Sequence, residues 1–265
     1  MAIIETQELT KQFGQVTAVN AVTVSVEAGE VFGLLGPNGA GKSTVTKMLV
    51  TLLSPTSGYA RVAGYDITRQ MSSVQRMIGY IPQALSVDGT LSGYENLLVI
   101  AKLYDIPRRK RIGHVRDALA YVGLEDVADR LVRTYSGGMI RRLEIAQAIL
   151  HRPPVLFMDE PTVGLDPVAR KTMWELVKQL CDDYGMTVFL TTHFMDEADT
   201  LCDRLAIMHL GRMVATGTPE QLKASLGKPN TTLDDVFIHY TGDYLATAGD
   251  YRDTSTTRRT AQRLG

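Results

Sequence analysis

A glycine-rich segment, residues 36–44, has the residue types that are needed to hold a chain of phosphates. It reads Gly-Pro-Asn-Gly-Ala-Gly-Lys-Ser-Thr and fits the pattern G-x-x-x-x-G-K-[ST]. Because glycines and a small alanine leave room around the backbone, successive N–H groups can turn inward toward anionic oxygens. We therefore expect a nucleoside triphosphate to bind against Gly36, Pro37, Asn38, Gly39, Ala40, Gly41, Lys42, Ser43 and Thr44.

The residues on either side place this segment between a strand and a helix. Residues 30–35 form an apolar run that is typical of a buried strand, and residues 42–53 are predicted to be helical. The positive end of that helix would point at the phosphates. Lys42 adds a point charge for the β- and γ-phosphates, and the Ser43 hydroxyl can be a ligand of Mg²⁺. A chance glycine-rich turn is the weaker interpretation.

Two adjacent carboxylates follow a second apolar strand. Residues 155–160 read Val-Leu-Phe-Met-Asp-Glu, so Asp159 and Glu160 stand at the carboxyl end of that strand. Two acids are costly there unless a cation or a reacting water lies beside them. Alongside a phosphate-binding loop, we assign Asp159 to the ligand shell of Mg²⁺ and Glu160 to the attacking water. A pair of acids without function is the alternative.

Three further positions have weaker signals. Gln83 follows a short strand that Pro82 closes, at the edge where ligands lie in open α/β sheets. Ser136 begins a Ser-Gly-Gly turn before a helix, where free N–H groups can bind an anion, although a simple capping turn is the better explanation of the turn on its own. Phe13 could stack on a nucleobase, but ordinary packing of an aromatic ring is the alternative.

Length and composition limit the class of protein. The 265 residues suffice for one large or two small domains, and 45% apolar and 22% charged residues are ordinary for a globular chain. A net charge of −1 gives no general reason to expect nucleic acid as a partner. Cys181 and Cys202 form no metal-ligand pattern and are expected to be buried free thiols. Without a signal peptide or a membrane-spanning run, we expect any membrane part to be another chain.

The pattern of elements predicts an α/β fold with a helical insertion. Residues 2–35 alternate as β-strands do, so we expect an antiparallel β-element that leads into the first buried strand. From about residue 90 to residue 150 the strand pattern disappears. Ser92 and Glu95 form a capping box before one helix, and two more helices follow, the last of which begins near Ser136.

Alternation of strands and helices returns after this insertion. We expect strands at residues 155–158, 187–191, 205–209 and 213–216, and helices at residues 167–184, 195–201 and directly after 218–219. The remainder is predicted to be a tail. Its last part, residues 243–265, is polar and rich in Thr and Arg, and composition leaves open whether it is loosely ordered or docks on a neighbour.

In their order along the chain, these motifs resemble those of the ATP-binding subunit of an ABC transporter, over residues 1 to about 225. The resemblance implies a P-loop NTPase (RecA-like) α/β sheet core, an N-terminal antiparallel β-element and an inserted α-helical subdomain at about residues 90–150. Residues 226–265 would be a C-terminal extension.

The resemblance also gives each motif a role. It identifies residues 36–44 as Walker A, Gln83 as the Q-loop, Ser136, Gly137 and Gly138 as the signature, Asp159 and Glu160 as Walker B with its glutamate, Asp166 as the D-loop and His193 as the switch histidine. Phe13 matches the aromatic residue that stacks on adenine. Glu160, His193 and Lys42 would then be catalytic, and Ser43, Gln83 and Asp159 would hold the metal.

Several segments look like the drug-resistance and polysaccharide-type exporter branch of this family. They are residues 135–146, 159–167, 191–198 and 232–237. Met139 stands where the commonest signature of the family has Gln, as in that branch. Ile140, where the branch often has a basic residue, leaves the substrate class open.

From the same resemblance we expect ATP and Mg²⁺ as cofactors and a separate transmembrane permease subunit as a partner. A second ATP-binding subunit, most simply a second copy, would complete the site head-to-tail. The chain would then lie in the cytoplasm, on the inner face of the cell membrane. An importer ATPase and, with less support, a soluble non-transport ATPase are the alternatives.

Overall fold

The computed structural model describes residues 2–247, and its centre is a six-stranded sheet in the order β10-β9-β3-β8-β7-β6. The strands are β3 Val31–Leu35, β6 Ile78–Ile81, β7 Val155–Asp159, β8 Thr187–Thr192, β9 Arg204–His209 and β10 Arg212–Gly217. All neighbours pair in parallel except β10, which is antiparallel to β9. The predicted α/β sheet core is confirmed.

The three middle strands are buried on both faces, as their apolar sequences require. Every residue of β3, β7 and β8 is buried, which is the usual state of parallel strands covered by other layers. Phe32, Phe157 and Phe189, one from each of these strands, are fully buried, and the Phe189 ring lies 5.6 Å from that of Phe32 and 5.5 Å from that of Phe157. This aromatic row locks the three strands together at the centre of the molecule.

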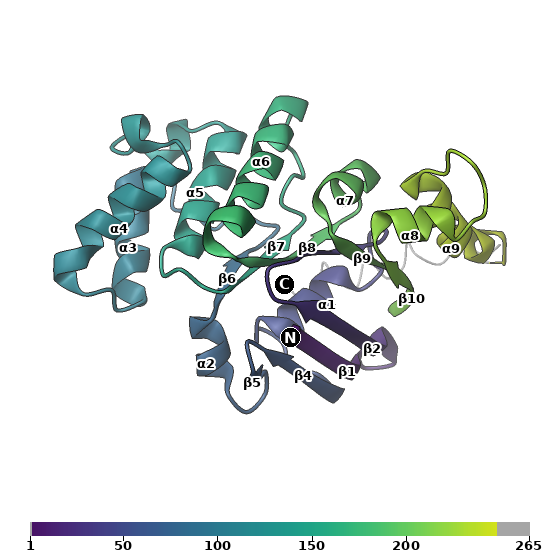
Figure 1. Cartoon of the computed structure of the whole chain (residues 1–265). Coiled ribbons are helices and arrows are strands. Elements are labelled where there is room, and N and C mark those ends of the chain that lie inside the picture. Colours follow the sequence, from purple (N-terminus) through teal and green to yellow (C-terminus); the bar gives the residue numbers. More distant parts are fainter. Residues whose placement is uncertain (1, 248–265) are drawn as a thin grey trace.

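A second, antiparallel sheet covers one face of the core (Figure 1). Its strands are β1 Ala2–Phe13, β2 Val16–Glu27, β4 Ser57–Val62 and β5 Tyr65–Asp66, in the order β2-β1-β4-β5. Helix α1, Lys42–Leu49, lies between the two sheets, and contacts β2 and β4 on one side and β7 and β8 on the other. The predicted N-terminal antiparallel element is therefore present, and it encloses the helix that follows the glycine-rich segment.

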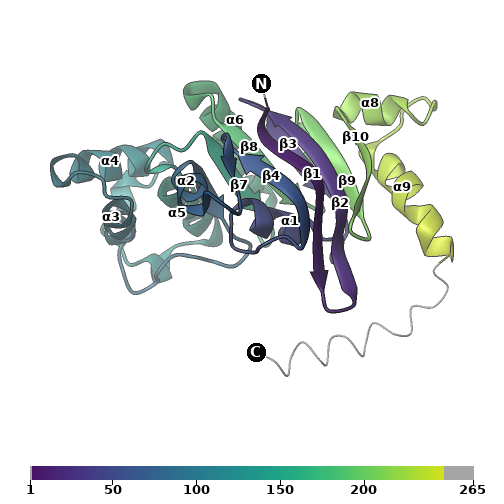
Figure 2. The same ribbon diagram turned by 90° about the horizontal axis from the view of Figure 1, so that it is seen from below.

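A helical subdomain is inserted between β6 and β7, as predicted, and extends to one side of the sheet (Figures 1 and 2). It contains α3 Gly93–Leu103, α4 Arg108–Tyr121, α5 Gly137–Ile149 and the short 3-10 helices Glu125–Val127 and Val132–Thr134, and the short helix α2, Met71–Arg76, precedes β6. The capping box of Ser92 and Glu95 begins α3. Together with α6 Pro167–Tyr184 and α7 Met195–Leu201, α5 covers the face of the sheet opposite α1.

The C-terminal region holds a helix that the sequence patterns missed. After α8, Pro219–Ala224, the chain forms α9, Leu233–Thr247, which packs against α7, α8 and β9. A capping signal was readable: Thr232 accepts a hydrogen bond from the Asp235 backbone N–H at 3.2 Å, and the Asp235 carboxylate accepts one from the Thr232 N–H at 2.9 Å. Of the tail predicted at residues 243–265, all beyond Thr247 lies outside the described residues.

Two further expectations concern the cysteines and membrane-spanning segments. Cys202 is buried and Cys181 is half-buried, and both are free thiols. Along residues 2–247, none of the helices has the length and apolar character that crossing a membrane requires.

The docking of α9 predicts that two of its residues contribute differently to the free energy of unfolding. Leu233 is 2% exposed in the main core, whereas Ile238 on the same helix is 63% exposed. We expect Leu233→Ala to lower the free energy of unfolding by about 2–4 kcal/mol, and Ile238→Ala by less than about 0.5 kcal/mol. Urea unfolding followed by circular dichroism measures both. Equal, small losses would show that α9 adds nothing to the fold.

Candidate functional site

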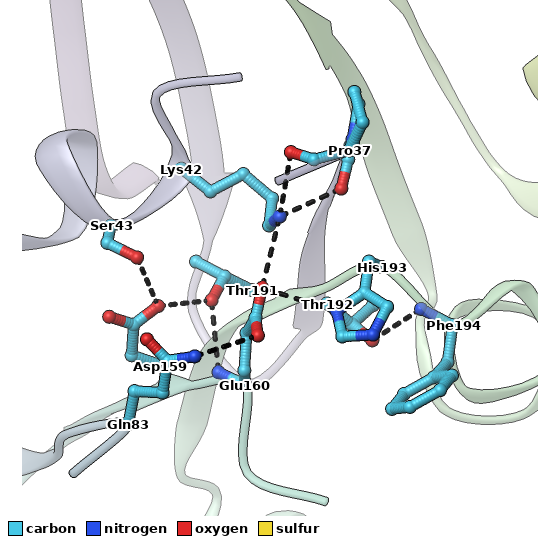
Figure 3. Close-up of polar contacts among 11 residues, drawn as sticks. Pro37, Lys42, Ser43, Gln83, Asp159, Glu160, Thr191, Thr192, His193 and Phe194 are labelled. Carbon is cyan, nitrogen blue, oxygen red and sulfur yellow. Dashed lines mark hydrogen bonds and ion pairs between the residues drawn. The ribbon is translucent and has the colours of Figure 1, made fainter. Parts of the chain in front are cut away.

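The glycine-rich loop lies at the carboxyl ends of β3, β7 and β8 (Figure 3). Two of its glycines are required by close backbone approach. A Cβ on Gly36 would lie 2.4 Å from the Met208 carbonyl oxygen, and one on Gly41 would lie 2.5 Å from that of Ala18. Gly41 also has a φ of +107°, which side chains of L-residues rarely allow. Both pattern glycines are therefore fixed by the packing of the loop against its neighbours.

The N-terminus of α1 has the properties of an anion site. Gly41 is its N-cap and contributes no side-chain hydrogen bond to the first turn, which also contains no acidic residue. The N–H groups of that turn consequently have no side-chain acceptor and carry the positive end of the helix. This is the arrangement that the sequence predicted for phosphate binding.

Lys42 is a buried cation with three oxygen neighbours. Its Nζ donates hydrogen bonds to the carbonyl oxygens of Gly36 at 2.8 Å and Pro37 at 3.2 Å, and lies 3.1 Å from Oε1 of Glu160. Both charged side chains are nearly inaccessible, at 4% and 6% exposure. Because a buried charge is costly without a partner, this ion pair fixes the loop against the end of β7.

Glu160 is the point at which most of the predicted site residues meet. Besides Lys42, its Oε1 lies 3.3 Å from Nδ1 of His193, and its Oε2 accepts a hydrogen bond from the Gln83 amide at 3.2 Å. Its backbone has a left-handed φ of +50° and its N–H donates to the carbonyl and the hydroxyl of Thr191, each at 3.1 Å. A non-glycine residue held in this conformation directly after a strand is a common mark of a functional position.

Asp159 supplies an oxygen cluster beside the loop. Its Oδ1 accepts hydrogen bonds from the hydroxyls of Ser43 at 3.0 Å and Thr191 at 2.6 Å. A carboxylate and a hydroxyl in contact are oxygen ligands of the kind that Mg²⁺ takes, with phosphates and water completing its octahedron. Across residues 2–247 there is no group of three or more His, Cys, Asp or Glu that could enclose a metal. The Asp159 carboxylate and the Ser43 hydroxyl fit a cation that is shared with a phosphorylated ligand.

A tyrosine beside this cluster stays neutral. Burial, and after it the charge of Asp159, raises the pKa of the Tyr80 hydroxyl to about 12. The site therefore gains no further negative charge from Tyr80 near neutral pH.

His193 lies between a carboxylate and an aromatic ring. Its ring centroid lies 4.2 Å from that of Phe194, and the approach of its Nδ1 to Glu160 lacks the alignment of a hydrogen bond. The Arg170 guanidinium lies 4.5 Å from the Phe194 ring and pairs with Asp196 at 3.2 Å. The histidine thus stands at the end of β8, between the acidic Glu160 and a supported aromatic ring.

Several of these residues were given no individual role in the sequence analysis. Thr191 bonds both acids of the pair, Thr192 accepts from the Phe194 N–H at 3.0 Å, and Arg170 supports the ring that packs on His193. Their position in the sequence was an available signal. Thr191 and Thr192 end a buried strand, and the carboxyl ends of neighbouring parallel strands share one edge of the sheet.

The remaining predicted residues lie outside this cluster. Ser136 caps α5 by accepting from the Met139 N–H at 3.3 Å, and Asp166 caps α6 by accepting from two backbone N–H groups at 2.9 Å. The start of α5 packs closely on the start of α6. A Cβ on Gly138 would lie only 3.1 Å from the Cβ of Ala169. Phe13 is 50% exposed, with the Lys11 ammonium 5.2 Å from its ring.

Apart from Phe13 at the end of β1 and the loop residues other than Lys42 and Ser43, the predicted residues form two groups. Lys42, Ser43, Gln83, Asp159, Glu160 and His193 are joined by contacts at one sheet edge. Ser136, Gly137, Gly138 and Asp166 form the second group at the start of α5 and α6. Among the described residues, no hydrogen bond or ion pair joins the second group to Lys42, Asp159 or Glu160. The first group presents a buried ammonium, two carboxylates and the N–H groups at the start of α1. The second presents two helix starts that are capped by the Ser136 hydroxyl and the Asp166 carboxylate.

Comparison with known proteins agrees with this geometry. The ABC transporter family matches residues 19–163. The daunorubicin/doxorubicin resistance ATP-binding protein DrrA of Streptomyces peucetius is 47% identical over 224 residues, which are 84% of this chain and 68% of that protein. The Nod factor export ATP-binding protein I of Burkholderia lata is 41% identical over 222 residues, 84% of this chain and 73% of that protein.

A solved structure described as the ATP-binding subunit of an ABC transporter has the same fold. It superposes with a TM-score of 0.80 at 28% sequence identity, and the match covers 90% of this chain and 99% of that one. The resemblance to the drug-resistance exporter branch is confirmed by these relatives. The chain belongs to the ABC transporter ATP-binding family, whose members bind ATP and hydrolyse it to drive transport.

Proposed function

We propose that this chain powers an exporter, as one of two copies that bind ATP between them and act on a separate membrane subunit. The observation that carries the proposal is the division of the site into two groups within one chain. The group around Lys42 can bind and hydrolyse a nucleotide, and the group at Ser136–Gly138 has donors and no nucleotide-binding cluster of its own. A second copy, turned head-to-tail, supplies each site with what it lacks.

Within one copy, the roles follow from charge and position. Lys42 and the N–H groups at the start of α1 neutralise the phosphates, and Glu160 takes a proton from the attacking water. Ser43 and Asp159, with Gln83 beside them, hold Mg²⁺, which when bound offsets phosphate charge. His193 faces the same carboxylate as Lys42, and we assign it to contact with the terminal phosphate. Phe13 is exposed and free to stack on the adenine ring.

Contact with the membrane subunit is best supported at one groove. It has a volume of about 970 Å³ and is lined in part by α2, α3 and α5. It also includes Ser86, from residues 82–86, which we call the Gln83 segment. Three apolar side chains on its wall are exposed: Leu52 at 63%, Leu103 at 72% and Tyr104 at 38%. A groove that exposes apolar side chains beside the Gln83 segment suits a segment of the permease. The chain would then lie on the cytoplasmic face of the membrane.

Export is favoured by the relatives' own names, which include drug resistance and Nod factor export. The substrate would be a drug, a lipid or a polysaccharide-like molecule. Import is the second candidate, because the groups described here serve either direction. A soluble non-transport ATPase has less support. We assign residues 1–225 to the ATP-binding domain and residues 226–265 to an extension, of which α9 docks on that domain.

The proposal is tested by the ATPase rate per subunit as a function of protein concentration. We expect the rate to rise with concentration, because each complete site needs two chains, and to rise again with membranes that contain the candidate permease. A rate that is independent of both would contradict the shared site and the transport role together.

Glu160→Gln tests the general base. The amide keeps the shape of the side chain but cannot accept the proton of water, so we expect ATP binding to persist and turnover to fall by about 10²–10⁴-fold. Fluorescent-nucleotide titration and phosphate release measure the two quantities. Glu175→Gln, the same change on an exposed face of α6, is the matched control. Near-normal hydrolysis by Glu160→Gln would refute the assigned role.

Lys42→Ala tests the phosphate site. Loss of the buried charge removes the cation that faces the β- and γ-phosphates, and we expect ATP affinity to fall by about 10-fold or more. Lys47→Ala, on the exposed side of the same helix, is the control and should bind normally. Unchanged binding by the Lys42 variant, with its fold verified by circular dichroism, would count against the site.

A further inference from the structure

Helix α5 carries a buried ion pair that the functions above do not use. Nη1 of Arg141 lies 2.8 Å from Oε2 of Glu144, one turn further along the helix. The two residues are only 5% and 2% exposed. A buried ion pair is weak evidence for stability, because the cost of removing both charges from water offsets their attraction. A contribution beyond stability is therefore the more informative explanation.

Both members of the pair bind the segment that contains Gln83. Arg141 donates to the carbonyl oxygens of Pro82 at 3.1 Å and Gln83 at 2.8 Å, using both arms of its guanidinium. Glu144 accepts from the Ser86 backbone N–H at 2.6 Å and from the Ser86 hydroxyl at 2.9 Å. The pair thus holds the Gln83 segment at both of its ends and fixes it to one face of α5.

These contacts connect three parts of the proposed machinery. The Gln83 amide bonds Glu160 at 3.2 Å, and α5 begins at the Ser136 turn. Ser86 and Glu144 also line the groove described above. A partner that binds in the groove and displaces α5 would therefore also shift the Gln83 amide. The link is made by charge-assisted hydrogen bonds, which are strong and directional.

We infer that Arg141 and Glu144 are positioning residues for ATP hydrolysis. They hold the Gln83 amide against Glu160 and make the Gln83 segment move together with α5. This inference rests on the proposed function only where it concerns the second copy and the membrane subunit. The positioning itself is a property of the single chain, and hydrogen exchange tests it there without a second copy.

The decisive comparison is between two neighbouring arginines on α5. Arg141→Lys keeps a positive charge near Glu144 but has one nitrogen, which cannot serve Glu144 and both carbonyls as the planar fork does. Arg142→Lys is the matched control, because Arg142 donates to the carbonyls of Val122 at 3.0 Å and Gly123 at 3.2 Å, at the end of α4, and not to the Gln83 segment.

For Arg141→Lys we expect kcat for ATP hydrolysis to fall by about 10-fold or more with KM for ATP unchanged, because the phosphate-binding loop is untouched while the geometry at Glu160 is loosened. Hydrogen exchange should accelerate in the peptide that covers residues 82–86 and stay unchanged in β7 and α1. Arg142→Lys should alter neither quantity. Equal kinetics for the two variants, or faster exchange throughout the fold of Arg141→Lys, would overturn the inference.

Ser86→Ala is a milder second test should Arg141→Lys fail to fold. It removes one hydrogen bond at 2.9 Å and leaves the ion pair in place. We expect a fall of a few-fold in kcat and faster exchange limited to the same peptide. Wild-type kcat and protection would contradict the inference. An ATPase rate per subunit of the wild type that does not depend on concentration would instead refute the shared site. The hydrogen-exchange result for the single chain would still stand.

Discussion

The structure depends on the contact between Lys42 and Glu160, which joins the phosphate-binding loop to the end of β7. Each of the two buried charges needs the other: loss of one partner of such a pair costs about 3–5 kcal/mol, because the remaining charge is left uncompensated. A triphosphate held at the start of α1 would give Lys42 new anionic partners and leave Glu160 available to a water. The ion pair that joins the loop to the end of β7 can therefore be exchanged for contacts with the substrate.

The parallel sheet is what brings these residues together. The strand ends of β3, β7 and β8 share one edge, and the buried row of Phe32, Phe189 and Phe157 keeps the three strands in register. Two layers cover the faces of this sheet: the antiparallel sheet holds α1 against one face, and α5, α6 and α7 cover the other. Small displacements of α5 can reach the site because Arg141 and Glu144 tie it to the Gln83 segment.

Much of this arrangement was predictable from the sequence, because it depends on local patterns. The glycine pattern, the apolar strand before Asp159 and the capping box at Ser92 each specify their own conformation. The contacts of Thr191 and Arg141 were not predictable, since they join segments that are distant in sequence. Helix α9 was missed because its cap, Thr232 with Asp235, uses a less common acid and follows a turn-rich stretch.

The most direct test of the central claim is the molar mass of Glu160→Gln in solution with and without Mg²⁺ and ATP, by light scattering after gel filtration. If two copies hold ATP between the Lys42 group of one and the Ser136 turn of the other, blocked hydrolysis should leave the pair closed, and the mass should double only with ATP. Ser136→Arg in the same background should bind ATP and remain single. A Glu160→Gln chain that binds ATP and stays monomeric at every concentration would contradict the account.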